Sequence, residues 1–363
     1  MSALFWFVIV ITPIVLVHEL GHFLFAKAFG VKVEVFSIGF GKALFKWKDS
    51  KDTIWQIALI PLGGFVKMYG DQGVVSTSDI KQLTNLSLQE KKLFLHTKKL
   101  WQKSLIVFGG PFANYLLTFL IFVTISMCSG VKEIKTEITS IQNDSPAAKA
   151  GLKLGDVIVD VDGQKITSVF DLKHKIASNP YINLTIGFVR KNTHLNAIIL
   201  PKEEFFQNIL GKTIKSRVIG VAFENFFFRK VNFRESLKNS FHQCIDMSCM
   251  ILKSIMQMLN SRSDVKNIGG PIKIAMYSEN IASQGLIALL YFIAVLSLNL
   301  GFINLLPIPM LDGGHLFFYA IEAVIRRPIN YKLQKLGFKF GFCVLIAVML
   351  IAFWNDLKGI GLL

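Results

Sequence analysis

The chain has 363 residues, of which 52% are hydrophobic and 32 are Phe, and its mean hydropathy is +0.48. The apolar residues come in long blocks, which excludes an ordinary pair of soluble domains. The formal net charge is +16. No nucleic-acid-binding motif accompanies this charge, and Lys beside apolar segments is typical of contact with anionic lipid headgroups. We therefore expect membrane lipid around the chain and no nucleic-acid partner.

The first apolar block, residues 3–29, contains His18-Glu19-Leu20-Gly21-His22. Two His four residues apart lie on one face of a helix and can bind one zinc ion. Glu19 is then a candidate general base beside the metal. Ionisable groups are costly in a bilayer, so their presence indicates function, here hydrolysis of peptide bonds within the membrane. An accidental match and a signal peptide are the alternatives. No Lys or Arg precedes the block and no small-residue cleavage site follows it, which disfavours a signal peptide.

Four apolar segments are long enough to span a membrane, roughly 3–29, 104–128, 285–306 and 338–354. Residues 30–100 carry eleven Lys against six acidic residues. The loop after the third segment is also basic, with Arg326, Arg327, Lys332, Lys335 and Lys339. Short basic segments face the cytoplasm, so both termini and the long interval 131–280 are predicted to lie outside.

Asp312 is the best candidate for a third zinc ligand, because catalytic zinc usually has three protein ligands and one open position. It follows Leu306-Pro307-Ile308-Pro309, where the prolines must end a helix. Irregular backbone at membrane depth is tolerated where protein or a wet cavity satisfies it. The alternative role for Asp312 is a helix N-cap, and the two roles are compatible. The predicted topology places His18, His22 and Asp312 at similar depth, near the cytoplasmic side.

Five further motifs follow the His-Glu-Leu-Gly-His segment along the chain: Phe36-Ser37-Ile38-Gly39-Phe40-Gly41, Ile60-Pro61-Leu62-Gly63-Gly64-Phe65-Val66-Lys67-Met68, Gly109-Gly110-Pro111-Phe112-Ala113-Asn114, Gly269-Gly270-Pro271-Ile272-Lys273-Ile274-Ala275 and the run from Asn299 to His315. With these motifs in this order along nearly its whole length, the chain resembles the site-2 proteases, a family of intramembrane zinc metalloproteases, and specifically the bacterial regulator-of-sigma-E type.

This resemblance implies Zn²⁺ bound by His18, His22 and Asp312, water activated by Glu19, and a substrate backbone held by Asn304. It implies a multi-pass protein of the bacterial cytoplasmic membrane that cleaves single-span membrane proteins, such as anti-sigma factors or remnant signal peptides.

Residues 30–70 alternate apolar and polar side chains and are predicted to form strands. The resemblance implies a re-entrant β-hairpin, whose free edge could take up an unwound substrate. We place this edge at Ile57 and Leu59, where proline should cripple cleavage while zinc content stays intact. The alternative is a hairpin lying on the bilayer surface.

The segment from Ser145 to Gly163 resembles a bacterial PDZ domain, and alternating Val157, Val159 and Val161 before Asp162-Gly163 indicate a strand and a turn. A PDZ domain that binds a peptide or substrate segment would recognise or exclude substrates, whereas the alternative is a folded spacer. Residues 233–259 show helical periodicity, which fits an interfacial amphipathic helix or a packed scaffold helix.

The expected fold is therefore a polytopic α-helical membrane protein with about four transmembrane helices, a re-entrant β-hairpin and one inserted extracytoplasmic PDZ domain. The expected segments are 1–29 (first membrane helix), 30–100 (cytoplasmic-side segment with the hairpin), 101–130 (second helix), 131–205 (PDZ domain), 206–284 (outer linker and amphipathic helix), 285–325 (third helix and the Leu-Asp-Gly segment) and 326–363 (basic loop and fourth helix). Two other functions stay open: an inactive PDZ-bearing membrane adaptor, and a metal transporter using the same ligands.

Overall fold

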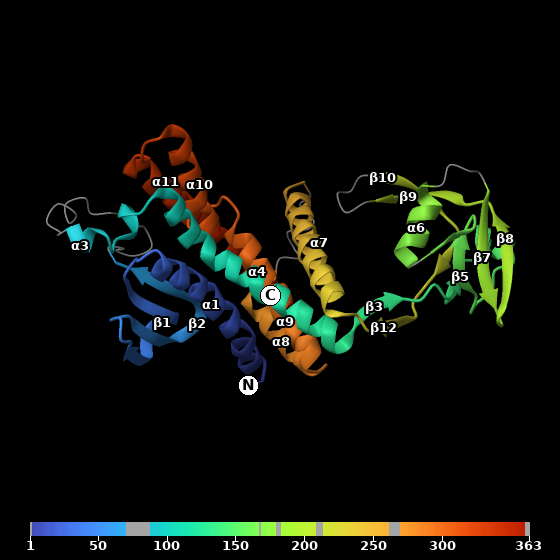
Figure 1. The fold of residues 1–363 in the computed structure, drawn as a ribbon, viewed down its shortest axis with the longest axis horizontal. Helices are drawn as coiled ribbons and strands as arrows, with labels where there is room; N and C mark the ends of the chain where they lie inside the picture. The colour runs from blue at the N-terminus through green and yellow to red at the C-terminus, as the bar shows by residue number, and fades with distance from the viewer. Residues whose placement is uncertain are drawn as a thin grey trace. The chain divides into compact units, whose positions relative to one another are not determined.

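The structure is a computed structural model and describes residues 2–69, 88–166, 168–178, 183–207, 213–260 and 269–359 (Figure 1). Its elements in chain order are α1 (Ser2–Ala28), β1 (Val33–Lys48), β2 (Ile54–Met68), α3 (Leu88–Lys91), η1 (Leu95–Thr97), α4 (Leu100–Ser129), β3 (Val131–Ile134), β4 (Ser140–Ile141), α5 (Pro146–Lys149), β5 (Val157–Val161), β6 (Gln164–Lys165), α6 (Val169–Ser178), β7 (Leu184–Arg190), β8 (Thr193–Ile199), β9 (Lys202–Gln207), β10 (Thr213–Val218), β11 (Val221–Ala222), β12 (Phe226–Arg229), α7 (Phe233–Asn260), α8 (Pro271–Ala282), α9 (Leu286–Asn304), α10 (Asp312–Ile325) and α11 (Tyr331–Gly359).

The chain divides into two compact units. The first contains Met1–Thr124, Asn239–Ile251 and Ser261–Leu363, and the second contains Ile125–Lys238 and Leu252–Asn260. The helices α4 and α7 therefore contribute residues to both units. The first unit holds the apolar helices and the hairpin, and the second holds most of the remaining strands.

Four helices in the described part of the chain are long and apolar enough to cross a membrane: Ala3–Ala28, Leu100–Ser129, Leu286–Asn304 and Lys332–Gly359. They coincide with the four apolar segments predicted from the sequence. Even the shortest, with 19 residues, is about 28 Å long at 1.5 Å per residue, close to the thickness of a bilayer's hydrocarbon core. The protein is therefore membrane-embedded.

Helices α1, α4 and α9 pack closely because small and hydroxyl side chains lie between them. A Cβ on Gly21 of α1 would overlap the backbone of Gly109 in α4, so these two helices approach at glycine. The Thr118 hydroxyl of α4 donates to the Ala294 carbonyl of α9 over 2.9 Å. Such contacts drive helix association in lipid, where burial of apolar surface gains little. The glycine contact brings the first half of α4 beside the second half of α1.

The Gly269-Gly270-Pro271 motif forms the N-terminus of α8, which the end of α11 caps. The fully buried Asp356 carboxylate accepts hydrogen bonds from the backbone amides of Gly270 (2.8 Å) and Ile272 (2.9 Å). An acidic group satisfies the free amides of a helix N-terminus and interacts favourably with its dipole. Pro271 lies at the first turn, where its missing amide costs nothing.

Residues 33–68 form a long antiparallel hairpin that lies beside α1 in Figure 1. Its pairing differs from the sequence prediction at one point. Residues 54–57 pair with 35–38 and also with 45–48, so Ile57 does not lie at a free edge. The prediction of an edge at Ile57 is wrong. The cause is a bend in β1 at Gly39 and Gly41, whose φ angles of +90° and +89° favour glycine, which brings the end of β1 back along β2.

A different segment of β2 lies at the edge. Residues 64–67 pair with residues 35–38, and among the described residues they have a strand partner on that side alone. Their other side is available for a further strand. The same segment lines the cavity described below, whereas 45–48, the opposite edge, does not.

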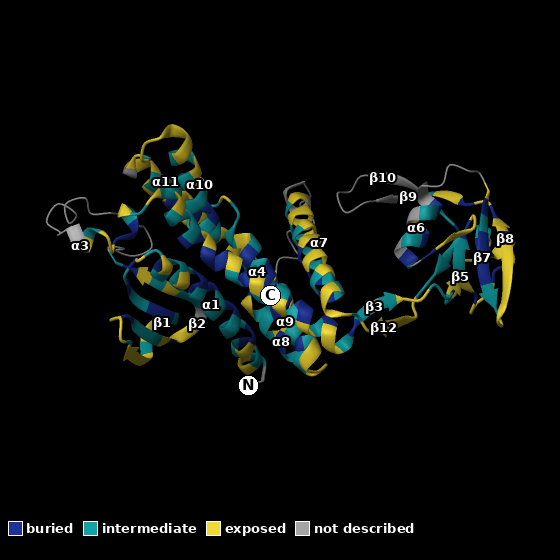
Figure 2. Ribbon diagram, in the orientation of Figure 1, coloured by how far each residue is buried: buried dark blue, intermediate teal, exposed yellow. Residues whose placement is uncertain are grey.

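The second unit contains a four-stranded sheet in the order β6-β5-β7-β8. Its central strand β7 is mostly buried, whereas β8 exposes one face (Figure 2). The core beneath it includes Ile138, Leu172, Ile186 and Ile219. Strand pairing continues past residue 205, where the predicted PDZ domain ends, because β11 pairs with β4 and β12 pairs with β3.

A buried ion pair fixes the turn before β5 to the end of β7. Asp156 is 1% exposed, and both its carboxylate oxygens accept from the Arg190 guanidinium over 2.7 Å. Burial raises the pKa of Asp156, but the bonds from Arg190 and from the Lys153 amide lower it more, so the net pKa lies below its usual range. The carboxylate therefore stays ionised at neutral pH and holds this turn in place.

Candidate metal centre

The structure brings His18, His22 and Asp312 together at one point inside the first unit. His18 Nε2 lies 3.3 Å from His22 Nε2 and 3.3 Å from one Asp312 oxygen. His22 Nε2 lies 3.5 Å from the other Asp312 oxygen. A tetrahedral zinc ion with bonds of 2.0–2.1 Å separates its ligand atoms by about 3.3 Å. The three donors are therefore spaced as the corners of one tetrahedral zinc site, which the His pair on α1 and the first residue of α10 provide.

The ring of His22 is oriented by a carbonyl of the neighbouring helix. Its Nδ1 lies 2.9 Å from the Ile106 carbonyl of α4, and a carbonyl can only accept a hydrogen bond. The proton must therefore be on Nδ1, which leaves the Nε2 lone pair directed at Asp312 and available to a metal.

Asn114 orients His18 in the same manner. This side chain is fully buried, and its amide lies 3.2 Å from His18 Nδ1. Its Oδ1 is buried and has no hydrogen-bond partner among the described residues. A half-turn of the amide places Oδ1 against a protonated Nδ1, which satisfies this oxygen and frees Nε2 as a ligand. The otherwise unpaired oxygen fits a metal-bound His18.

Gly110 leaves space for the two imidazole rings because it has no side chain. A Cβ at this position would lie 2.8 Å from His18 Cε1 and would overlap His22 Nε2. The glycine therefore lets α4 pass directly over the His pair, close enough for its Ile106 carbonyl and Asn114 amide to reach the rings. The sequence analysis identified the Gly109-Gly110-Pro111 motif but not this role.

We expect Gly110→Ala to displace both imidazoles and to remove bound zinc, because the added methyl group occupies ligand space. Metal content and cleavage rate should fall together, which metal analysis of purified protein measures. Gly269→Ala is the matched control. Its Cβ meets only flexible carbons of Lys273, the nearest at 3.1 Å, so zinc and activity should be retained. Full zinc content in Gly110→Ala would contradict this assignment.

Asp312 reaches the imidazoles through an irregular segment between α9 and α10. Residues 305–311 contain Pro307 and Pro309 and form no helix. Gly313 and Gly314 lie directly against carbonyls of this segment, and a Cβ on either would overlap them. The N-cap of α10 is Leu311 and Asp312 is its first residue, so the predicted alternative of an N-cap role for Asp312 is wrong. Its carboxylate faces the His pair instead.

A cavity of about 670 Å³ surrounds the three donors. Glu19, 8% exposed, lines it, as does Asn304, whose amide lies 3.4 Å from His18 Nε2. Residues 63–66 of the hairpin line another part of its wall. Gly64 permits this approach, because a Cβ there would lie 2.9 Å from Glu19 Cγ. All five residues proposed from the sequence thus line one cavity, together with His315.

The sequence is similar to those of proteins named as metalloproteases. The sequence profile of peptidase family M50 matches residues 6–348. A protein named as a zinc metalloprotease in Rickettsia conorii is 36% identical over 99% of both chains. One named likewise in Mesorhizobium japonicum is 34% identical, covering 97% of this chain and 98% of that protein. Metalloprotease MmpA of Caulobacter vibrioides is 33% identical, covering 96% and 94%.

Among solved structures, the PDZ domain of the SdrC-like protein from Listeria monocytogenes is similar to part of the chain. It is 22% identical, covers 26% of this chain and 90% of that domain, and superposes with a TM-score of 0.21.

Proposed function

Because the chain belongs to peptidase family M50, the site-2 proteases, we propose that this metalloprotease cuts single-span membrane proteins within their transmembrane segments. The observation that supports this most is the tetrahedral spacing of His18, His22 and Asp312. Both His and the neighbouring Glu19 belong to a helix apolar enough to span the bilayer. The substrates would be anti-sigma-factor-like proteins or remnant signal peptides, and the site of action the bacterial cytoplasmic membrane.

The chemistry is divided among the residues that line the cavity. His18, His22 and Asp312 would hold Zn²⁺, which lowers the pKa of a bound water towards about 7 and polarises a carbonyl. Glu19 accepts the proton of the attacking water and returns it to the leaving amine. Asn304 donates its amide to the substrate backbone at the cleaved bond. The position of Glu19 and Asn304 in the lining of one cavity supports these roles.

The cavity-lining edge of the hairpin would hold the substrate extended. A helical backbone uses its own hydrogen bonds, so the substrate must unwind before hydrolysis. The unwound substrate would pair as an additional strand with the open side of residues 64–67, which is β-augmentation. This proposal replaces the edge expected at Ile57 and keeps the same mechanism of substrate uptake.

We expect Phe65→Pro to cripple cleavage while zinc content stays at the wild-type level, because proline removes an amide donor and distorts the edge. Phe45→Pro is the matched control, since Phe45 pairs in the segment at the opposite edge and does not line the cavity. Cleavage of a model transmembrane peptide measures both variants. Equal rates in the two would reject substrate uptake at residues 64–67.

The second unit would filter substrates as an extracytoplasmic PDZ domain. A groove of about 590 Å³ lies between α6 and residues 217–223 within this unit. Its lining combines apolar side chains such as Leu172 and Ile176 with two basic residues, Lys173 and Arg217, and one acidic residue, Glu204. Such a groove suits a peptide segment with an acidic group or a free carboxylate. It would thereby exclude membrane proteins whose outer domain is intact.

Most of the proposed filter can be deleted at a place where the two remaining chain ends lie close together. The Lys135 amide donates to the Asn225 carbonyl over 2.8 Å, so the ends of a deletion of residues 136–224 are adjacent. A two-glycine link should close β3 and β12 into a hairpin. Wild-type protein in liposomes should cut a single-span substrate trimmed outside and spare the intact one, whereas the deletion should cut both. Unchanged selectivity would reject the filter.

The same assay separates the proposed protease from the inactive adaptor that is the alternative function. Mass analysis of the products should place the cut inside the transmembrane segment. Absence of both cleavage and stoichiometric zinc would favour the adaptor, whereas stoichiometric zinc without cleavage would favour the metal transporter.

A further inference from the structure

The ribbon formed by β3 and β12 begins where α4 ends. α4 ends at Ser129 and β3 begins at Val131. Residues 104–131 contain no charged side chain. Its helical part, residues 104–129, is about 39 Å long at 1.5 Å per residue, which is close to the thickness of a bilayer with its headgroup layers, about 40–45 Å. The start of the ribbon therefore lies at headgroup depth.

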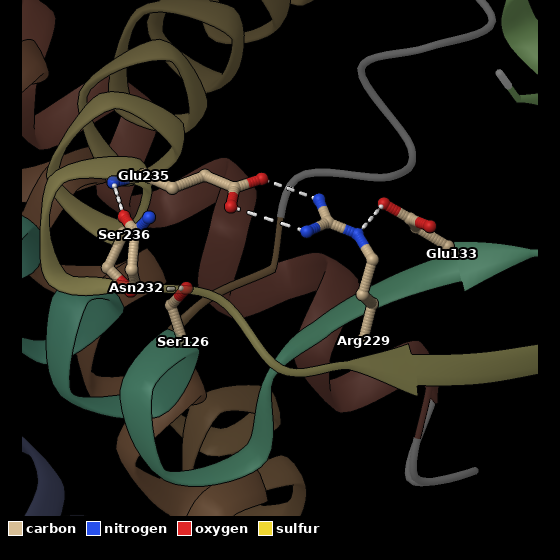
Figure 3. Close-up of polar contacts among 6 residues, drawn as sticks. All are labelled: Ser126, Glu133, Arg229, Asn232, Glu235 and Ser236. Carbon is tan, nitrogen blue, oxygen red and sulfur yellow. Dashed lines mark hydrogen bonds and ion pairs between the residues drawn. The ribbon is translucent and has the colours of Figure 1, made fainter.

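The orientation of the ribbon against the end of α4 is fixed within the second unit (Figure 3). The Arg229 guanidinium donates to Glu133 of β3 over 2.7 Å and to both carboxylate oxygens of Glu235 in α7. The Ser236 hydroxyl donates to the Ser126 hydroxyl of α4 over 3.1 Å. These hydrogen bonds thus connect β3, β12, the end of α4 and the start of α7.

The two faces of the ribbon differ in chemistry. Side chains of directly paired residues share a face of a sheet, and neighbours along a strand alternate. Phe226 pairs with Ile134, and Phe228 lies two residues along the same strand. The Phe226 and Phe228 rings touch edge to face, with centroids 5.9 Å apart. Ile134, Phe226 and Phe228 therefore share one face, on which the register also places Lys132 opposite Phe228, whereas Val131, Glu133, Phe227 and Arg229 share the other.

The three large apolar side chains of the first face are exposed, although such side chains are usually buried in a folded domain. Ile134 is 45% exposed, Phe226 50% and Phe228 56%. Exposed basic side chains flank the ribbon, namely Lys135, Lys230, Arg234 and Lys238. The acidic Glu133 and Glu235 both pair with Arg229, so this cluster keeps one net negative charge against the four flanking cations. An aromatic face flanked by cations at headgroup depth is complementary to an anionic lipid interface.

We propose that Ile134, Phe226 and Phe228 form an interfacial anchor that inserts into the lipid leaflet at the end of α4. The Arg229 network turns this face towards lipid and keeps the charged face away from it. The anchor fixes the base of the second unit at the bilayer surface.

The test places a photoreactive benzoylphenylalanine at single positions of the full-length protein in vesicles of phosphatidylethanolamine and phosphatidylglycerol. After irradiation, mass spectrometry counts lipid adducts. The probe at Phe228 should give several-fold more lipid adduct than the probe at Phe227, which has the same residue type in the same strand on the opposite face. Ile198 in β8, 71% exposed, is the background control.

Equal lipid adduct at Phe228, Phe227 and Ile198 would overturn the anchor. So would adducts at Phe228 that join a second copy of the chain in place of lipid. If the Phe228 variant does not purify as a single folded species, the probe at Ile134 on the partner strand gives the same test, with the same excess expected.

Discussion

Glu19→Gln is expected to abolish cleavage and to leave zinc bound. The amide has the size of the carboxylate but cannot accept a proton from water, and a general base contributes about 10²–10⁴ in rate. We expect the rate of cleavage of a transmembrane peptide to fall by at least about 10², with one zinc per chain unchanged. A product assay on proteoliposomes, paired with metal analysis, measures both quantities.

The matched control for this variant is Glu224→Gln, since Glu224 is an exposed acidic residue of the second unit. It should cleave at the wild-type rate. A Glu19→Gln protein that retains activity within about tenfold of wild type would contradict the general-base role, because that role is worth more than this. Loss of zinc in Glu19→Gln would instead assign Glu19 to the metal.

Asp312→Ala is expected to lose both zinc and activity. The carboxylate is the one donor contributed by α10, and it lies 3.3 and 3.5 Å from the two imidazoles. Loss of an outer-shell partner costs about 10–100-fold in metal affinity, and loss of a direct ligand should cost more. Titration with zinc under a competing chelator measures the affinity, and excess zinc should restore occupancy in part.

Asp246→Ala serves as the control, because Asp246 is exposed on α7. Its zinc affinity should equal that of the wild type. Wild-type affinity in Asp312→Ala would show that the carboxylate is not a ligand and that its approach to the His pair is structural.

Much of the site was predictable because its spacing is local or follows from topology. The four-residue interval between His18 and His22 fixes both on one face of α1. Asp312 comes from nearly three hundred residues away, yet the prolines before it and the placement of Lys put it at the same depth. Predicted depth in the membrane thus relates segments that are far apart in the sequence.

The supporting residues were not predictable in the same way. Gly110 and Asn114 act through the crossing point of α1 and α4, which depends on the packing of glycines from two helices. The hairpin edge at residues 64–67 depends on a bend at Gly39 and Gly41, which alternation of side chains does not reveal. The short strands β11 and β12, with 2 and 4 residues, carry too little periodicity to be found before their partners are known.

The most direct test of the proposed metal centre is X-ray absorption at the zinc edge on purified wild-type protein. We expect one zinc per chain, with two imidazole nitrogens at about 2.0–2.1 Å and oxygen ligands at about 2.0–2.2 Å. The Asp312→Ala protein should lose this signal. A spectrum with sulfur at about 2.3 Å, or purified protein without stoichiometric zinc, would contradict the ligand set of His18, His22 and Asp312.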